Sequence, residues 1–243
     1  MRASKLTERD AVLEIVKTGT LKVEKDNLDI STELEMNSSK IYREEQISKI
    51  EIKGKEKAES CRVYIIPYGS GDVPFDERFK TDEKDKVCIL NFASSKHAGG
   101  GFMTGAYAQE EDLCYHSNLF NCLEKYEKFY EFNRQHLNRG LYTEGIIFTE
   151  NVVFFKQRFA NVKPELADVI TCAAPNKGAA LRNGVKAPEV DKVMTARLEK
   201  ILKVAIDNNV ETLVLGAFGC GVFGNNPYKV ASIIDILLNV RGY

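Results

Sequence analysis

The sequence predicts a three-layer α/β fold built on a mixed, mostly parallel sheet. Short apolar runs rich in β-branched residues alternate with segments in which apolar residues recur at helical spacing, and this alternation is typical of such folds. The run Val87–Phe92 is almost continuously apolar, as expected of a strand that is covered on both faces. With 243 residues, of which 44% are hydrophobic, the chain is long enough to bury a sizeable core.

The beginning of the chain is expected to form an accessory segment, residues 1–58, ahead of a main domain at residues 59–243. A helix is predicted to open with Thr7 as its N-cap and to stop at Gly19. The rest of the segment is polar and only weakly periodic. The elements expected in it are a short strand at 21–23 and a helix or strand near 41–52.

In the main domain, the pattern predicts strands that alternate with helices. Strands are expected at 61–66, 87–92, 169–173 and 212–217, with two short β-rich runs within 145–155. One long helix is expected after residue 111, and further helices at 190–208 and 226–240. Residues 69–85 are expected to form a surface loop. Ligands of such sheets gather beyond the carboxyl ends of the strands, so a site is expected there.

Charge and cysteine content limit the classes of function. A net charge of −1 argues against an electrostatic nucleic-acid binder, and without a long apolar run or an apolar leader the expectation is a cytoplasmic monomer with no membrane association. The six cysteines include no Cys-x-x-Cys pair, so buried free thiols are expected and a metal site is not. No motif orients His97, Cys114 and His116 as nucleophile and base, and we interpret them as structural.

The most informative motif follows the strand predicted at 87–92. It combines three consecutive glycines with a glutamine and two glutamates: Gly99, Gly100, Gly101, Gln109, Glu110 and Glu111. Consecutive glycines are used where the backbone needs unusual dihedral angles or where a ligand must approach the main chain closely. The adjacent carboxyl groups supply acid–base chemistry. The combination predicts a nucleotide-sugar site, in which backbone N–H groups hold phosphates and a glycosidic bond lies near a carboxylic acid.

Three segments together resemble the microbial poly(ADP-ribose) glycohydrolases, which have a macrodomain fold. Asn91–Glu111 resembles the signature of this family, Asp168–Asn176 is similar to its central strand and the loop that follows, and Leu215–Pro227 looks like its second substrate loop. The resemblance runs from about residue 61 to about residue 230. It implies a three-layer α/β/α macrodomain-like fold and an enzyme that hydrolyses ribose–ribose O-glycosidic bonds to release ADP-ribose, with no metal or redox cofactor.

The resemblance also implies different roles for the two glutamates. Glu111 would protonate the departing ribose oxygen and then activate water, and Glu110 would hold ribose hydroxyls beside it. Adjacent residues of a helix point in different directions, so the two carboxyl groups cannot flank one bond as those of ordinary glycosidases do. Glu111 must carry a proton when substrate binds, which burial and a neighbouring charge favour. Taken alone, two glutamates at a helix start would only complement the helix dipole.

Ligand contacts are implied for both glycine-containing segments. Asn91 resembles a polar ribose contact, and glycines 99–101 would let the loop wrap the distal ribose and diphosphate. Gln109 is left between two roles, fixing the helix start or binding a sugar hydroxyl. The second loop would hold phosphate through its backbone, with an aromatic ring against ribose, and Pro175 and Asn176 would lie near the adenine. The residues of this loop are Gly219, Cys220, Gly221, Val222 and Phe223.

Two alternative functions stay open. One is a hydrolase that removes a single ADP-ribose from a protein or nucleic-acid acceptor, and the other is a non-catalytic ADP-ribose reader. Glu111 argues against the reader, since a buried acid facing a glycosidic oxygen adds nothing to binding. Relatives usually continue past the last helix into a further strand, whereas this sequence stops at Tyr243. If the last strand is missing, a sheet edge or a hydrophobic face would be exposed unless the N-terminal segment or a partner covers it.

Overall fold

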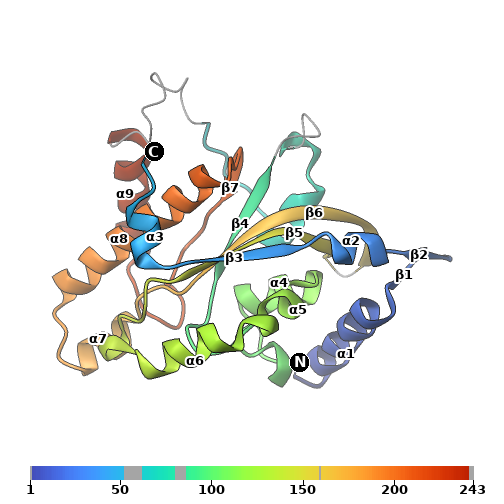
Figure 1. Cartoon of the computed structure of the whole chain (residues 1–243), viewed down its shortest axis with the longest axis horizontal. Helices are drawn as coiled ribbons and strands as arrows, with labels where there is room; N and C mark the ends of the chain where they lie inside the picture. Colours follow the sequence, from blue (N-terminus) through green and yellow to red (C-terminus); the bar gives the residue numbers. More distant parts are fainter. Residues whose placement is uncertain (1, 52–61, 80–85, 159, 241–243) are drawn as a thin grey trace.

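A mixed five-stranded sheet lies at the centre of the fold, within the residues that the computed structural model describes: 2–51, 62–79, 86–158 and 160–240 (Figure 1). In spatial order the strands are β3 (Ser38–Tyr42), β5 (Ile146–Gln157), β6 (Ala160–Cys172), β4 (Val87–Phe92) and β7 (Thr212–Val214). β6, β4 and β7 are parallel, whereas the β3–β5 and β5–β6 pairs are antiparallel. The predicted mixed sheet is confirmed, but the expectation that it is mostly parallel is wrong, because two of its four described strand pairs, including the long β5–β6 pair, are antiparallel.

β4 shows why a run of apolar residues was needed at this position. Five of its six residues are buried. Ile89 packs into the core on one face of the sheet, while Cys88 and Leu90 pack into the core on the other face. A strand covered on both sides cannot alternate apolar with polar residues. The strand predicted at 87–92 is confirmed with its bounds.

Helices cover both faces of the sheet, which gives the predicted three layers (Figure 1). The helices that pack into the core containing Ile89 are α1 (Arg2–Thr18), α4 (Gln109–His116) and α5 (Leu119–Leu123). Those that pack into the core containing Leu90 are α3 (Glu44–Ser48), α8 (Ala187–Asp207) and α9 (Pro227–Asp235), which runs on into a π-helical turn at Ile236–Val240. The helices predicted at 190–208 and 226–240 are therefore confirmed to within a few residues. No described helix is both long and apolar enough to cross a membrane.

The first 51 residues supply one edge of the sheet. After α1, the strands β1 (Thr20–Val23) and β2 (Asp26–Asp29) form a separate hairpin, and α2 (Ser31–Glu35) leads into β3. β3 lies beside β5, with Tyr42 opposite Ile146. The strand predicted at 21–23 is confirmed, and the segment 41–52 contains both expected alternatives, the end of β3 and α3.

The start of α1 differs from the prediction, whereas its end agrees. The helix begins at Arg2, so Thr7 lies inside it, and its hydroxyl donates to the carbonyl of Ala3 instead of capping an N-terminus. The side chains of Lys5, Glu8 and Arg9 contact distant parts of the chain and hold this part of the helix in place, beyond its local cap signal. Gly19, with φ of +65°, terminates the helix as predicted.

The strand predicted at 61–66 is wrong. Arg62–Ile66 has no regular structure, and its side chains are exposed up to Ile65, Val63 by 74% and Ile65 by 97%, whereas Ile66 is half-buried against the core. Cys61 lies outside the described residues. β-Branched residues favour a strand only when a neighbouring strand pairs with them and a face is buried. No strand in the described part of the chain pairs with 62–66, and only Ile66 contacts the core.

Two further predictions for the middle of the chain are corrected. The two short β-rich runs within 145–155 are one strand, β5, with an irregular register between Thr149 and Val152. The long helix expected after residue 111 is broken into α4, α5 and α6 (Glu127–Gln135), with a 3-10 turn at Glu124–Tyr126. The first break has a clear cause, because Ser117 is extended and forms a bridge with Phe154 of β5.

The segment expected as a surface loop at 69–85 is partly buried. It contains the 3-10 helices η1 (Ser70–Phe75) and η2 (Glu77–Phe79), and η1 buries Gly71, Val73 and Pro74. Residues 80–85 lie outside the described residues. β6 starts earlier than predicted and β7 ends at Val214, three residues early. Short helical turns that the pattern did not indicate are η3 (Phe102–Thr104), η5 (Asn138–Gly140) and α7 (Lys177–Arg182).

Candidate active site

The carboxyl ends of β6, β4 and β7 bring the three predicted segments to one edge of the sheet. These strands are parallel neighbours, so the loops that leave them emerge on the same side. The rings of Phe92, at the end of β4, and Phe218, in the second loop, meet edge to face with centroids 5.7 Å apart. The fold thus places segments far apart in the sequence around one site.

The glycine triplet is packed directly onto the two glutamates. Gly100 has φ of +59°, and a Cβ atom on it would lie 2.4 Å from Glu111 Oε1 and 2.7 Å from Glu110 Oε2. Gly99 has φ of +62°, and its Cβ would lie 2.9 Å from the ring of Phe120. A side chain at either position would have to displace these groups. Within the protein itself, the glycines are therefore needed for close contact between backbone and carboxyl groups.

Glu111 is held by the glycine loop through one of its oxygens. Oε1 accepts a hydrogen bond of 2.7 Å from the backbone N–H of Gly101. The residue is only 8% exposed and lies in the first turn of α4. Oε2 forms no hydrogen bond with any described residue. One oxygen is thus fixed by the protein while the other has its hydrogen-bonding capacity unused.

Glu110 is buried more completely, and its surroundings change its ionisation. It is 4% exposed, and its carboxyl group accepts hydrogen bonds from the Ser94 N–H at 2.7 Å and from Asn91 Nδ2 at 3.3 Å. Burial raises the pKa of Glu110 to about 8, with a smaller contribution from the charge of Glu111, although the two hydrogen bonds act in the opposite direction. The neutral form therefore predominates at neutral pH.

The raised pKa of Glu110 predicts a pH-dependent effect of Glu110→Gln on stability. The folded protein binds the proton of Glu110 more tightly than the unfolded chain does, so wild-type stability falls as pH rises from about 4.5 towards about 8. An amide lacks this ionisation. Relative to the wild type, the variant is therefore expected to gain a few kcal/mol in unfolding free energy between pH 5 and pH 8.5, since one pKa unit corresponds to about 1.4 kcal/mol. At pH 5 it is expected to be the less stable protein, because its amide nitrogen cannot accept one of the hydrogen bonds that the carboxyl group receives from Ser94 and Asn91.

Thermal melts of both proteins across this pH range check the prediction, with the exposed Glu14→Gln on α1 as the control that should show no such trend. A Glu110→Gln variant whose melting temperature stays parallel to that of the wild type from pH 5 to 8.5 would show that Glu110 ionises normally.

Gln109 uses its whole amide group inside the protein. Its Oε1 accepts a hydrogen bond from the Phe92 N–H at 2.8 Å, and its Nε2 donates to the Leu90 carbonyl at 2.9 Å and to Ser70 Oγ at 3.0 Å. The side chain therefore ties the start of α4 to the end of β4 and to η1. Of the two roles that the sequence left open, this geometry matches the fixing of the helix start.

Asn91 is fully buried beside Glu110. Its Nδ2 also lies 3.3 Å from the hydroxyl of Thr171, while its Oδ1 is buried without a hydrogen-bond partner. An unsatisfied buried polar atom calls for an explanation in a native structure. Here it places an unused acceptor next to the two carboxyl groups, where the sequence predicted a polar ribose contact.

The second loop is anchored to the loop that follows β6. Asn225 Nδ2 donates to the carbonyls of Pro175 at 2.8 Å and Gly219 at 2.9 Å. Gly219 has φ of +70°, and a Cβ on it would lie 2.5 Å from that of Ala174. The Cys220 N–H donates to the Ala217 carbonyl. These contacts fix the shape of the loop from its inner side.

The outer side of the second loop presents three successive unused donors. The backbone N–H groups of Gly221, Val222 and Phe223 donate to no described residue. Val222 is 95% exposed, and no atom lies within 4 Å of where a Cβ on Gly221 would stand. A run of free N–H groups in a glycine-rich turn is typical of a phosphate-binding loop.

The aromatic ring of the second loop packs close to the residues predicted near the adenine. The ring centroids of Phe223 and Tyr142 are 5.8 Å apart, and the hydroxyl of Tyr142 accepts a hydrogen bond from Asn176 Nδ2. Asn176 also caps α7 by accepting from the Ala179 N–H. Pro175 and Asn176 therefore lie on the side of the site occupied by the second loop.

Of the three residues interpreted as structural, His116 and Cys114 are buried. His97 is exposed, and among the described residues it contributes only backbone hydrogen bonds, with Ser94 and Gly100. The two ring nitrogens of His116 face the carbonyls of Asp112 and Arg158, and burial raises the pKa of the Cys114 thiol well above its usual range, which makes it a poor nucleophile. The cysteines that the structure describes are free thiols: Cys88, Cys114, Cys122, Cys172 and Cys220. Within the described ranges, no group of three or more His, Cys, Asp or Glu side chains is arranged to hold a metal ion.

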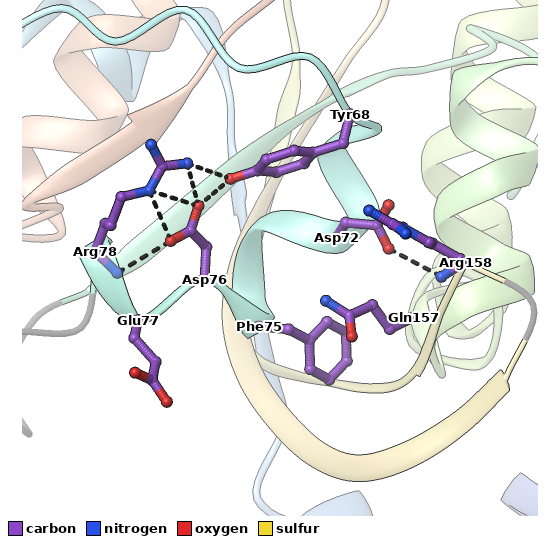
Figure 2. A pocket seen from close by; sticks show the side chains of 8 residues that line it. All are labelled: Tyr68, Asp72, Phe75, Asp76, Glu77, Arg78, Gln157 and Arg158. Carbon is purple, nitrogen blue, oxygen red and sulfur yellow. Dashed lines mark hydrogen bonds and ion pairs between the residues drawn. The ribbon is translucent and has the colours of Figure 1, made fainter.

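A cavity of about 400 Å³ lies beside η1 and contains none of the predicted site residues (Figure 2). Asp76 forms an ion pair with Arg78 there, and Asp72 accepts a hydrogen bond from the backbone of Arg158. The sequence pattern did not indicate this cavity, because its walls come from η1, η2 and the far end of β5.

Comparison with known proteins agrees with this arrangement. The profile described as microbial-type PARG, catalytic domain, matches residues 10–157. The structure is similar to that of poly(ADP-ribose) glycohydrolase from Thermomonospora curvata, with TM-score 0.87 and 28% identity over 97% of this chain and 87% of that one. It is also similar to the complex of the Thermomonospora curvata enzyme with the inhibitor ADP-HPD, with TM-score 0.83, 28% identity and the same coverage.

A second organism provides a similar structure with a bound nucleotide. The glycohydrolase from Deinococcus radiodurans in complex with ADP-ribose has TM-score 0.71 and 31% identity over 83% of this chain and 81% of that one. Among curated proteins, none matches this sequence significantly. The profile match ends at residue 157, so the second loop is compared only through the solved structures.

Proposed function

This chain belongs to the microbial-type poly(ADP-ribose) glycohydrolase family, and from this premise we propose that Glu111 is the general acid and base with which it cleaves the polymer. The chain is a glycosidase that hydrolyses poly(ADP-ribose) and releases ADP-ribose. The observation that best supports the role of Glu111 is its position: a nearly buried carboxyl group held by the Gly101 N–H, with its second oxygen unused.

The proposed reaction has two proton transfers at the same carboxyl group. Glu111, protonated when the polymer binds, gives its proton to the ribose oxygen that leaves as the ribose–ribose bond breaks. The positive charge that develops on the ribose ring is that of an oxocarbenium-like centre. The Glu111 carboxylate then takes a proton from water, whose oxygen bonds to the anomeric carbon, and the starting form of the enzyme returns.

Glu110 is proposed to position rather than to transfer protons. Its two oxygens accept hydrogen bonds from Ser94 and Asn91, and its neutral form, which predominates at neutral pH, carries a proton that can be donated to a ribose hydroxyl. The negative charge that the sequence led us to expect beside Glu111 is absent in this form. Asn91, with its unused buried Oδ1, is proposed to contact the same ribose.

The second loop is proposed to bind the diphosphate through its free backbone donors. Hydrogen bonds from backbone N–H groups to a charged phosphate contribute about 1.5–3 kcal/mol each. Phe223 would then lie against the ribose, and Pro175 and Asn176 near the adenine, on the side of the site where the Phe223 and Tyr142 rings meet.

Gly221→Val is expected to weaken ADP-ribose binding by at least an order of magnitude without unfolding the protein. The branched side chain would add bulk beside the unused N–H groups of residues 221–223 and restrict the approach of phosphate to them. The fold should survive because a Cβ at this position meets no protein atom. Calorimetry with ADP-ribose, together with a thermal melt, measures both effects, and unchanged affinity in a folded variant would mean that phosphate binds elsewhere.

Two labelled substrates test whether the enzyme acts on the polymer or on a single ADP-ribose. Incubation with labelled poly(ADP-ribose) is expected to release free ADP-ribose, whereas protein carrying a single labelled ADP-ribose is expected to keep its label, because the proposed leaving group is a ribose hydroxyl. Release from the mono-modified protein at a comparable rate would favour the mono-ADP-ribosyl hydrolase.

Excess chelator should leave the polymer activity intact, since the proposed proton transfers need no metal.

The remaining parts of the proposal concern organisation. We take residues 1–58 to be an accessory segment of the catalytic domain at 59–243, and the protein to act as a cytoplasmic monomer on ADP-ribose polymer attached to protein, with no sequence-specific nucleic-acid partner. Light scattering measures whether the protein is a monomer. Expression of residues 59–243 alone tests whether the catalytic domain folds without the accessory segment.

A further inference from the structure

The segment that joins the glycine triplet to the glutamates, residues 102–108, is gripped from outside by α1. This linker contains η3, whose middle residue is Met103, and it ends where α4 begins. α1 comes from the beginning of the chain and packs against both η3 and α4. Residues Lys5 to Arg9, which make the contacts, precede the part of the chain that matches the family profile, 10–157.

Arg9 provides the first contact between α1 and the linker. Its Nη1 donates a hydrogen bond to the carbonyl of Met103, 94 residues away in the chain. The orientation of the guanidinium group is fixed by Asp10, whose Oδ1 accepts from Arg9 Nε at 2.9 Å and from Nη2 at 2.6 Å. The arginine therefore reaches the linker as an oriented donor.

Lys5 provides the second contact, through two aromatic rings. Its Nζ lies 4.2 Å from the ring centroid of Tyr107 in the linker and 4.5 Å from that of Tyr115 in α4. Tyr115 in turn donates a hydrogen bond of 3.1 Å from its hydroxyl to the carbonyl of Ala106. One ammonium group thus holds the linker and the helix that carries the glutamates against each other.

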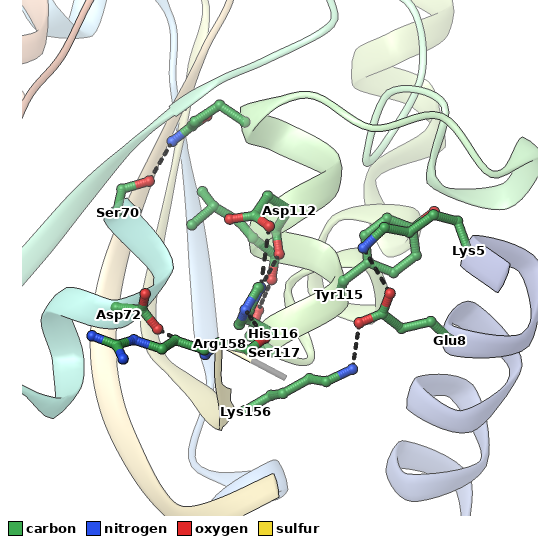
Figure 3. Close-up of polar contacts among 12 residues, drawn as sticks. Lys5, Glu8, Ser70, Asp72, Asp112, Tyr115, His116, Ser117, Lys156 and Arg158 are labelled. Atoms are coloured by element: carbon green, nitrogen blue, oxygen red, sulfur yellow. Dashed lines mark hydrogen bonds and ion pairs between the residues drawn. The ribbon is translucent and has the colours of Figure 1, made fainter. Parts of the chain in front are cut away.

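Glu8 links α1 to the sheet (Figure 3). Its carboxylate accepts a hydrogen bond of 2.7 Å from Lys5 and another from Lys156 near the end of β5. All three side chains are less than 20% exposed. Burial by itself would raise the pKa of Glu8, but the hydrogen bonds from Lys156 and Lys5 outweigh it and hold the pKa below its usual value. Glu8 therefore connects α1 to β5 through Lys156.

The linker is coupled directly to the atom that orients Glu111. The carbonyl of Gly101 accepts hydrogen bonds from the N–H groups of Thr104 and Ala106, and the N–H of the same Gly101 holds Glu111 Oε1. Gly101 therefore connects the two: its carbonyl is held by the linker, and its N–H holds the carboxyl group of Glu111.

We propose that α1 is a clamp on the catalytic linker, with Arg9 and Lys5 as positioning residues for Glu111. This proposal rests on the role of Glu111 in the proposed function. It adds that α1, whose Arg9 and Lys5 contact the linker and not the two glutamates, sets the position of the Glu111 carboxyl group. Misplacement of a catalytic group by about 1 Å can cost about 10²-fold in rate, so loss of one anchor is expected to be visible in kcat.

The test compares Arg9→Ala and Lys5→Met with a matched control on the same helix. Both variants are expected to lower kcat on poly(ADP-ribose) by about 10-fold or more, while KM and the Kd for ADP-ribose stay within about three-fold. Arg9→Lys keeps a donor for the Met103 carbonyl and is expected to recover most of kcat. Lys17→Ala removes an exposed charge from the far end of α1 and should change nothing.

Hydrogen exchange provides a readout that does not depend on activity. In Arg9→Ala, amides 102–108 are expected to exchange faster while those of β4 keep their protection. Unchanged kcat in both variants would overturn the proposal, as would a rise in KM alone, which would mean that the two cations contact the polymer. If Arg9→Ala does not fold, the kcat values of Lys5→Met and Arg9→Lys test the proposal instead. A wild-type protein that releases no ADP-ribose would overturn the proposed function, and exchange at 102–108 would still report whether α1 holds the linker.

Discussion

Glu111→Gln is expected to lower kcat on poly(ADP-ribose) by about 10²–10⁴-fold, the range found when a general acid or base is lost. The amide keeps the shape of the side chain, and its oxygen can still accept the hydrogen bond from the Gly101 N–H. It has no proton to give to the departing ribose oxygen and cannot take one from water. Steady-state kinetics on labelled polymer measures the loss.

Binding should survive the same substitution. The diphosphate is proposed to bind at Gly221–Phe223, on a different loop, so the Kd of Glu111→Gln for ADP-ribose is expected to stay within a few-fold of that of the wild type. Near-normal turnover in this variant would remove Glu111 from the chemistry. A large loss of affinity would instead place its carboxyl group among the main binding contacts.

Gly100→Ala is expected to cost about 10²-fold in kcat, because the added methyl group would occupy the space of both carboxyl groups. The Cβ would lie 2.4 Å from Glu111 Oε1 and 2.7 Å from Glu110 Oε2, so both side chains would have to move from their hydrogen-bonded positions. Displacements of this size are enough to misalign an acid with the bond that it protonates. Kinetics on polymer, with a thermal melt of the same sample, separates this effect from unfolding.

Gly184→Ala is the matched control for this substitution. Gly184 also has a positive φ, +77°, but nothing lies within 4 Å of its Cβ position. Both variants carry the backbone strain of a left-handed alanine, about 1–2 kcal/mol. Only Gly100→Ala should lose activity beyond what its stability explains, and equal activity in the two variants would show that the glycine triplet does not set the geometry of the carboxyl groups.

The parts of the fold that local pattern determines were predictable from the sequence. β4 follows from a run of apolar residues that only a doubly covered strand needs, and α8 from apolar spacing over 21 residues. The positions of the site loops follow from a general rule for α/β sheets. Gly100, Gly101, Glu110 and Glu111 do lie together, and their separation in the chain is short.

The wrong predictions share a physical cause, the dependence of local structure on distant partners. The segment 62–66 has strand composition but no neighbour among the described residues that pairs with it. Ser117 interrupts a helical pattern because it bridges to Phe154, 37 positions later. α1 extends to Arg2 because Lys5 and Glu8 are anchored to other elements. None of these partners can be read from the neighbouring residues.

The supporting contacts of the site were equally invisible in the sequence. Ser94 binds Glu110 through its backbone N–H, which any residue supplies, so its type carries no signal. Ser70 binds Gln109 from a segment expected at the surface. Arg9 and Lys5 lie in what reads as an ordinary amphipathic helix. Gln109 was the one supporting residue with a usable signal, since an uncharged side chain beside two glutamates at a helix start suggests a structural contact.

The general-acid role of Glu111 is tested most directly by changing the leaving group. In an ADP-ribose that carries a p-nitrophenoxy group on the anomeric carbon of its distal ribose, this group leaves as p-nitrophenolate without being protonated. Added azide can replace the water that Glu111 would activate. With this substrate and azide, Glu111→Gln is expected to form the ADP-ribosyl azide within about 10-fold of the wild-type rate of p-nitrophenolate release, although it remains about 10²–10⁴-fold impaired on polymer. An equal impairment on both substrates would contradict the assignment of Glu111 as the acid.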